Sequence, residues 1–152
     1  MRFNPTQAIG VGALAALCVL IACSRIYTVA EGVYIPGDAP VDQKLATAQD
    51  IGKEVWEGGI TQRVHERFPE LTPDELSGVF LRWETISVTP VTSESQPTTG
   101  VRIRAGIQHR GTVKNARAIA KLCADTVAEA IRRRTGAPEV YRLDLNEQSF
   151  SF

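Results

Sequence analysis

The sequence predicts an α+β fold, a two-layer sandwich with the element order α–β–β–α–β behind an N-terminal apolar signal or anchor helix. Three stretches support this prediction. Residues 112–135 repeat apolar side chains at steps of three and four, as one helix face does. Residues 101–108 alternate apolar and polar side chains, as a half-buried strand does. Residues 8–22 carry no charge. A long helix with one apolar stripe needs a sheet to lie on, which gives two layers.

The first 23 residues have the layout of a signal peptide or membrane anchor. A short polar segment with Arg2 precedes the uncharged stretch, and signal peptides show the same order. The stretch ends in Leu20-Ile21-Ala22-Cys23, which resembles the lipobox of bacterial lipoproteins. That resemblance implies cleavage before Cys23 and a diacylglyceryl group on it, and two or more acyl chains anchor a protein stably. An uncleaved transmembrane helix over residues 8–24, short for a bilayer span, and a buried soluble segment are the alternatives.

Residues 24–40 are predicted to be a tether to an α+β domain that comprises residues 41–152. The tether has some strand character, so a short edge strand is an alternative. Pro36-Gly37 and Pro40 interrupt any such strand.

The first half of the domain is predicted to be helical. Apolar spacing indicates a helix over residues 42–56, which Gly58-Gly59 interrupts before a second piece over residues 60–68. Pro69 ends that piece, because the residue before a proline avoids the helical conformation. Residues 72–75 read Thr-Pro-Asp-Glu, which predicts a capping box and a short helical turn.

Two strands follow, joined by a polar loop over residues 93–100. Residues 79–91 are rich in β-branched and aromatic side chains, but their apolar parity switches, which predicts a β-bulge near Glu84-Thr85. The second strand, residues 101–108, is predicted to point four apolar side chains inward, namely Val101, Ile103, Ala105 and Ile107. The side chains predicted to point outward are Arg102, Arg104 and Gln108.

The long helix and a last strand complete the domain. Thr112 is the predicted N-cap of the helix. Gly136 can adopt the left-handed conformation that ends a helix, and Pro138 prevents continuation. The arginines at 132–134 suit the negative end of the helix dipole. Residues 140–145 predict a strand that returns beside the hairpin.

The formal net charge of zero conceals two halves of opposite sign. Residues 23–100 contain 6 Lys/Arg against 12 Asp/Glu, a net charge of −6, and residues 101–134 contain 9 against 2, a net charge of +7. The simplest interpretation is that the two halves neutralise each other inside one fold. Head-to-tail self-association and a basic face for anionic lipid are the alternatives.

The basic half supplies the candidate binding residues. A basic face is predicted from the outward side chains of the second strand and the first turns of the long helix, composed of Arg102, Arg104, Arg110, Lys114, Arg117 and Lys121. Anionic headgroups or an acidic protein surface fit such a face. Nucleic acid is not expected as a partner, since no aromatic side chains interleave with the basic ones to stack on bases. Scattered surface charge is the alternative interpretation.

The sequence contains no recognisable catalytic or metal-binding motif. His65 and His109 lie outside any metal-ligand spacing, and no nucleophile has an evident paired base. Cys123 falls on the apolar stripe of the long helix, which predicts an inert core thiol. We therefore expect no enzymatic activity, cofactor, metal or small-molecule substrate.

Residues 100–146 combine the strand Gly100-Val101-Arg102-Ile103-Arg104, the long helix, the Thr135-Gly136 stop and a strand over residues 139–145. This combination resembles the alkaline-shock, general-stress envelope protein family. The resemblance implies an α+β domain that associates with membranes, self-assembles and has no enzymatic activity. The order of elements also resembles phospholipid-binding periplasmic domains of the osmotically inducible kind and ring-building domains of secretion-system lipoproteins.

These observations predict a non-enzymatic, membrane-tethered cell-envelope protein. Its α+β domain is expected to lie outside the cytoplasm and to bind a protein partner or further copies of itself. A ring or collar subunit of a secretion, conjugation or transport complex is one alternative, and a phospholipid-binding periplasmic domain is another.

Overall fold

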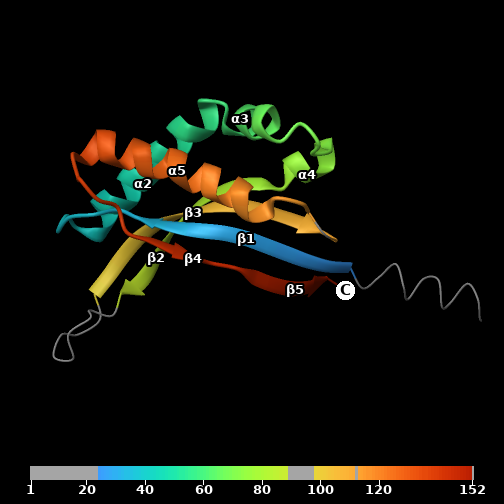
Figure 1. Ribbon diagram of the computed structural model, residues 1–152. Helices are drawn as coiled ribbons and strands as arrows, with labels where there is room; N and C mark the ends of the chain where they lie inside the picture. The colour runs from blue at the N-terminus through green and yellow to red at the C-terminus, as the bar shows by residue number, and fades with distance from the viewer. Residues whose placement is uncertain (1–23, 89–97, 112, 152) are drawn as a thin grey trace, which may run out of the picture.

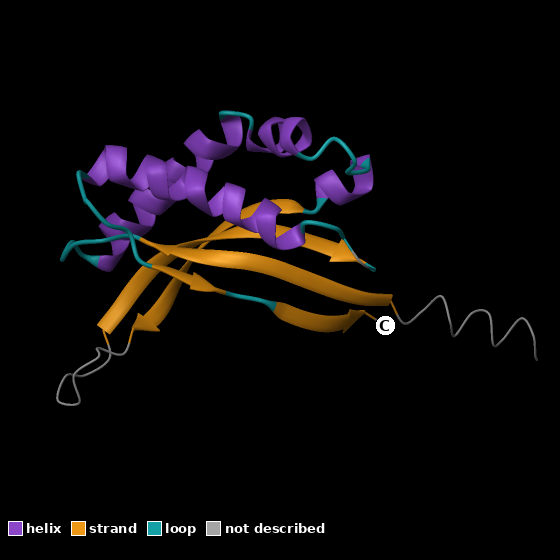
Figure 2. Cartoon of the chain, in the orientation of Figure 1, coloured by secondary structure: helices purple, strands orange, loops and turns teal. Residues whose placement is uncertain are grey.

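The computed structural model describes residues 24–88, 98–111 and 113–151. All described helices lie on one face of a single twisted sheet (Figure 1), and Figure 2 shows the two layers by element type. The elements are β1 (Ser24–Tyr34), α2 (Val41–Glu57), α3 (Ile60–Arg67), α4 (Pro73–Ser77), β2 (Val79–Val88), β3 (Thr98–Arg110), α5 (Ala116–Thr135), β4 (Arg142–Asp144) and β5 (Glu147–Ser151). The predicted α+β class is confirmed.

The predicted N-terminal signal or anchor helix lies outside the described residues, as does Cys23, the predicted site of lipidation. Within the described ranges, no helix combines the length and the hydropathy needed to cross a bilayer.

The strand β1 runs through the middle of the sheet, where the sequence predicted a tether. Residues 26–34 pair with β3 on one side, and β4 and β5 pair with β1 on the other. Val33 is buried on the helix side of β1, and Ala30 is buried on the opposite side. A Cβ atom on Gly32 would lie 3.0 Å from two neighbouring side chains, so there is space for only a small residue at this position. Small residues in β1 interrupt the apolar alternation by which a buried strand is recognised in a sequence. The tether prediction is therefore wrong for residues 24–34.

The sheet is antiparallel, with the strand order β2-β3-β1-β4 and with β5 also beside β1. Asp144 of β4 lies opposite Glu31. Glu147 of β5 lies opposite Thr28, so β4 and β5 keep one register and act as a single interrupted edge strand. The course β–α–β–β–α–β, with β1 and β3 in the centre, is the ferredoxin-like arrangement. The predicted order of elements lacked the first of these strands.

The core lies between the helices and one face of the sheet. The inward residues of β3 confirm the predicted alternation, since each is at most 1% exposed: Val101, Ile103, Ala105 and Ile107. The helices cover them with Ile51, Val55, Ile119, Val127 and Ile131. The other face of the sheet carries no described helix (Figure 2), and Arg102, Arg104 and Gln108 lie on it, as predicted.

Several local predictions are confirmed. Gly59 has a φ of 80° and separates α2 from α3. Thr72 and Glu75 form a capping box, in which the Thr72 N–H donates to the Glu75 carboxylate at 2.8 Å. Gly136 has a φ of 71° and ends α5. Each of these features depends on residues close in sequence, which is why the sequence indicates them.

Other local predictions differ from the structure. β2 and β3 pair without offset from Val79–Ile107 to Val88–Thr98, so the predicted β-bulge near Glu84-Thr85 is wrong. The apolar parity switches because Ile86 lies on the helix-free face of the sheet. α5 begins at Ala116, whereas the predicted N-cap Thr112 lies outside the described residues. The last strand, predicted over residues 140–145, is shorter in the structure and corresponds to β4, whereas β5 follows beyond the predicted range.

The two charge halves meet between α2 and α5. Arg133 in the last turn of α5 lies 3.1 Å from Glu54, and Arg134 lies 2.8 Å from Asp50. These pairs join the acidic half of the sequence to the basic half within one fold. This arrangement agrees with the simplest interpretation of the charge pattern, in which the two halves neutralise each other. Exposed ion pairs of this kind contribute only about 0–1 kcal/mol each to the free energy of unfolding. They therefore compensate the charges of the two helices without being a main source of stability.

Candidate functional site

An apolar groove with two exposed tryptophans lies between α2 and the edge strand β2. Trp56 near the end of α2 is 48% exposed, and Trp83 in β2 is 39% exposed. The groove has a volume of about 550 Å³ and is lined by Gln49, Asp50, Gly52, Lys53, Trp56, Leu81 and Trp83. Tryptophan is enriched among the residues that dominate protein interfaces. We call this surface the tryptophan groove.

Gly52 shapes the floor of the tryptophan groove. It is buried within α2, and a Cβ atom on it would lie 2.7 Å from Cε3 and Cζ3 of Trp83. Glycine inside a helix costs about 0.5–1 kcal/mol relative to alanine. The missing side chain lets the Trp83 indole rest against the backbone of α2. Trp56 lies one helical turn further along the same face, so the two indoles flank one depression.

Among the described strands, β2 pairs with β3 alone, so its outward backbone groups are unpaired by any described strand at the edge of the sheet beside this groove. The Gln108 N–H donates to the Gly78 carbonyl at 2.8 Å, which identifies their pair as hydrogen-bonded. Because such pairs alternate along an antiparallel ladder, Leu81, Trp83 and Thr85 direct their N–H and C=O groups away from β3. β2 contains no proline and pairs without a bulge, so it lacks two of the devices that protect an edge strand.

The predicted basic face is divided between two sides of the molecule. Arg102 and Arg104 lie on the helix-free face of the sheet, where acidic residues pair with them. The Arg102 Nε lies 2.6 Å from Glu84, and an Arg104 amino group lies 2.9 Å from Glu147. Burial alone would lower the pKa of Arg102, but its hydrogen bonds to Tyr34 and Glu84 outweigh burial and raise the pKa. Arg102 therefore keeps its charge to hold the sheet together.

The remaining basic residues lie at the end of β3 and on α5. Arg110 ends β3, and Lys114 is exposed in the turn that follows. Arg117 and Lys121 belong to α5, in the helix layer. Arg117 and Lys121 lie on the other side of the sheet from Arg102 and Arg104, so these two pairs do not share a surface. The structure therefore does not gather the six predicted residues into one basic face.

Lys121 takes part in a charged cluster that ties α5 to the edge of the sheet. Its ammonium group lies 2.9 Å from Asp125, and Arg142 of β4 bridges Asp125 to Glu31 of β1. Burial alone would raise the pKa of Asp125, but the hydrogen bonds from Lys121 and Arg142 outweigh burial and hold the pKa below its ordinary value. The cluster supports the fold and leaves little of this charge for a partner.

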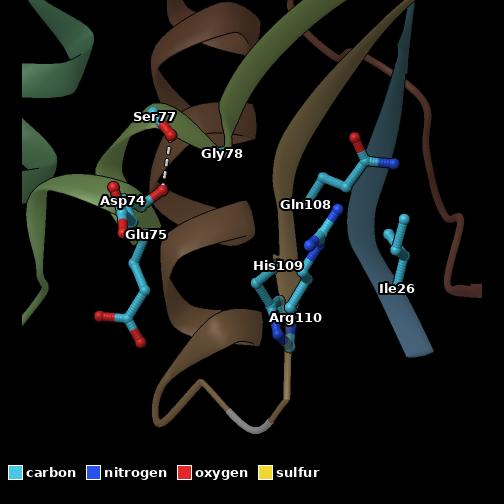
Figure 3. Close-up of a pocket in the computed structure, with 8 residues that line it drawn as sticks. All are labelled: Ile26, Asp74, Glu75, Ser77, Gly78, Gln108, His109 and Arg110. Carbon is cyan, nitrogen blue, oxygen red and sulfur yellow. Dashed lines mark hydrogen bonds between the residues drawn. The ribbon is translucent and has the colours of Figure 1, made fainter. Parts of the chain in front are cut away.

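A second cavity, of about 630 Å³, lies where α4 meets the end of β3 (Figure 3). Asp74 and Glu75 of α4 line it together with His109 and Arg110 of β3. The His109 Nδ1 lies 3.1 Å from the carbonyl oxygen of Gly111. A carbonyl can only accept, so we assign the hydrogen of a neutral ring to Nδ1. The buried Nε2 has no hydrogen-bond partner among the described residues.

Among the described residues that line this cavity, the Ser77 hydroxyl is not hydrogen-bonded to a side-chain base. The Ser77 hydroxyl donates to the main-chain carbonyl of Asp74 at 2.6 Å (Figure 3). A nucleophile would instead need a side-chain base to take its proton. Hydrogen bonds from the Thr72 N–H and hydroxyl hold the pKa of Glu75 below its ordinary value. Glu75 is therefore ionised at neutral pH and does not serve as a proton donor.

The described residues also provide no metal-binding or thiol chemistry. Burial raises the pKa of the Cys123 thiol to about 12, so Cys123 carries no thiolate at neutral pH. In the ranges that the structure covers, no three His, Cys, Asp or Glu side chains are grouped to hold a metal ion.

The chain matches no protein-family model, and no curated protein or solved structure is significantly similar to it. The fold and the surface residues are therefore the basis for inferring its function.

Sequence reasoning missed the tryptophan groove. Helical spacing groups Trp56 with the apolar residues of α2, and strand parity groups Trp83 with Val79 and Leu81. Neither pattern indicates that the two tryptophans are exposed. Their exposure follows from the position of β2 at the edge of the sheet. The available signal was Gly52, because an isolated glycine inside a helical pattern often marks a close approach of another group.

Proposed function

We propose that this protein is a non-enzymatic, membrane-tethered cell-envelope protein whose ferredoxin-like domain binds another protein molecule through the tryptophan groove and the edge of β2. The observation that carries the proposal is the pair of exposed tryptophans, 48% and 39% accessible, beside a strand with free backbone groups. Aromatic anchors and main-chain hydrogen bonds are the two sources of affinity when a strand is added to a sheet edge.

The proposed anchor places the domain directly at the membrane surface, outside the cytoplasm. The lipobox-like residues end at Cys23, and β1 begins at Ser24, so no flexible linker separates a lipid on Cys23 from the sheet. Intact mass of the protein from its native membrane, beside a Cys23→Ala variant, tests this anchor. A wild-type mass lacking residues 1–22 and increased by acyl chains is expected. A full-length mass in both proteins would instead support an uncleaved transmembrane anchor.

Site-specific photo-crosslinking in the native membrane tests the binding surface. A benzophenone amino acid in place of Trp56 should yield a discrete crosslinked product. The same group in place of Glu66, an exposed residue of α3, should not. Adding Trp83→Ala should reduce the Trp56 product. If Trp56 and Glu66 give the same pattern, the tryptophan groove is not a binding surface and the proposed function fails.

Contact with anionic lipid is a second candidate function, favoured by the position of Arg110. Arg110 lies opposite Ile26, at the end of the sheet where β1 begins (Figure 1). Amide exchange of the full-length protein in nanodiscs tests this contact. Phosphatidylglycerol should slow exchange over residues 110–114. Lys114→Glu should remove that protection, whereas Arg132→Glu, near the other end of α5, should not. Equal exchange with and without the anionic lipid excludes this candidate.

A further inference from the structure

We propose that β2 pairs with β2 of a second copy of this chain, antiparallel and centred on Trp83, so that two sheets join into one across a two-fold axis. This inference rests on the proposed function, because it names the molecule that the edge of β2 and the tryptophan groove bind. Three independent features of β2 support it: the direction of its backbone groups, the order of its charges and the position of its tryptophan.

The backbone allows only certain registers. Residues that direct their N–H and C=O groups outward must lie opposite each other to exchange two hydrogen bonds. Leu81, Trp83 and Thr85 face the edge in this way, as established by the hydrogen bond from Gln108 to Gly78. A two-fold axis at Trp83 satisfies this condition, because Trp83 then lies opposite itself and Leu81 lies opposite Thr85 of the second copy.

The charges select one of the allowed registers. With the axis at Trp83, Arg82 lies opposite Glu84 of the second copy, and the same pair forms twice by symmetry. Opposite charges in directly facing positions stabilise strand pairs. Moving the axis by one residue places either Arg82 or Glu84 opposite its own copy, so that like charges face each other. Moving the axis by two residues places Arg82 opposite Phe80 or Val88, so none of these shifts pairs opposite charges. The β2 sequence is therefore complementary to itself in the register centred on Trp83.

The same register explains the exposed tryptophans. An axis perpendicular to a continuous sheet places both helix layers on the same side. The two Trp83 side chains then meet at the axis, and Trp56 of each copy flanks them across the two grooves. The contact is isologous, so it closes at two copies. It also covers an edge that would otherwise remain open to aggregation.

The decisive experiment measures, by light scattering in detergent micelles, the molecular mass of the protein purified from its native membrane. The wild-type protein should have the mass of two chains. Thr85→Pro removes an outward N–H without touching the ladder to β3 and should give one chain. Thr85→Val keeps that N–H and should remain dimeric. A monomeric wild-type protein, or a dimer that persists in Thr85→Pro, overturns the proposal.

Amide exchange makes the result independent of any folding defect in the proline variant. In wild-type protein, exchange at Leu81, Trp83 and Thr85 should slow as the concentration rises, while exchange at the amides directed toward β3 should stay slow throughout. Fast exchange at the three outward amides at every concentration overturns the pairing. If the chain is monomeric yet Trp56 still crosslinks to a different molecule, a foreign partner occupies the groove, and only the dimer inference fails.

A charge-reversal pair tests the register itself. Arg82→Glu creates two facing carboxylates in a homodimer, and Glu84→Lys creates two facing cations. Each variant should therefore dimerise more weakly, roughly tenfold in dissociation constant. Mixing the two variants should restore association, because every facing pair is then of opposite sign. Absence of a heterodimer in the mixture, with both variants folded by circular dichroism, excludes the register centred on Trp83.

Discussion

Replacing Gly106 by alanine tests whether β1 is packed against β3 in the centre of the sheet. An added Cβ atom would lie 2.3 Å from the carbonyl oxygen of Val29 and 2.6 Å from the Cβ of Ala30. Non-bonded carbon atoms prefer about 3.5–4.0 Å, so β1 and β3 must separate by about 1 Å. Both clashes involve atoms on or next to the backbone, which cannot turn aside as the end of a long side chain can.

The expected cost combines overpacking with weakened hydrogen bonds. Overpacking a well-filled interior costs about 1–3 kcal/mol, and each weakened ladder bond costs about 1 kcal/mol. Alanine also lowers the conformational entropy of the unfolded chain, which stabilises the folded state by about 0.4–1 kcal/mol and offsets part of this cost. We therefore expect Gly106→Ala to lower the free energy of unfolding by about 3 kcal/mol, a large share of the about 5–15 kcal/mol of a typical domain.

Urea denaturation of the full-length protein in micelles, followed by far-ultraviolet circular dichroism, measures this cost. Gly111→Ala is the matched control, because nothing lies within 4 Å of its added Cβ and only its φ of 71° opposes alanine. That strain costs about 1–2 kcal/mol. Combining Ala30→Gly with Gly106→Ala removes one clash and should restore part of the loss. If Gly106→Ala costs no more than Gly111→Ala, β1 does not pack here and the reasoning is refuted.

Three further predictions follow from the site and the core. Gly52→Ala would place a methyl group 2.7 Å from the Trp83 ring. This clash should push the indole outward into water and red-shift the Trp83 fluorescence, measured in a Trp56→Phe background. An unchanged spectrum would contradict the described packing of Trp83 on Gly52. The stability of the Gly52→Ala variant should change by less than about 1 kcal/mol, because the better helix propensity of alanine offsets the lost contact. Asp125→Asn should destabilise the protein at pH 7 by up to about 1 kcal/mol, given the exposure of the pair. Because the folded-state pKa of Asp125 is lowered, its stabilisation is complete above the unfolded pKa and lost as pH falls through the folded pKa. Urea titrations should therefore show the two proteins converging below about pH 4, and a constant difference would exclude this cause. The Cys123 thiol, with a pKa of about 12, should resist iodoacetamide at pH 8 until urea unfolds the chain, as peptide mass mapping of the modified protein would show; rapid labelling of the folded protein would disprove its burial.

The features predicted correctly from sequence depend on local patterns. β3 has strict alternation along its inward residues, and α5 has a continuous apolar stripe closed by Gly136. The capping box at Thr72 and Glu75 is a contact over three residues. Such signals do not require knowledge of which elements become neighbours, so the sequence alone indicates them.

β1 could not be predicted in the same way, because its burial depends on distant partners. Its centre contains Ala30 and Gly32, which carry too little apolar surface to indicate a core strand. Their small size is needed because Gly106 approaches Ala30 and side chains from β3 and the last strand cover Gly32. A packing requirement of this kind becomes visible only when the neighbouring strands are placed.

The candidate site shows the same limit. Strand parity placed Arg102 and Arg104 on the correct face, but the acidic side chains that pair with them come from other strands. The tryptophan groove depends on β2 being an edge strand, and strand order is a property of the whole sheet. Surface accessibility at Trp56 and Trp83 therefore follows from topology rather than from the residues beside them.

The position of β1 also determines how the domain withstands mechanical load. Force transmitted through residue 24 would pull along β1, which is hydrogen-bonded to β3 on one side and to β4 and β5 on the other. A pull parallel to a strand loads these transverse bonds in shear, so many must break together rather than open one by one. A domain held through the proposed anchor would therefore resist tension applied along β1.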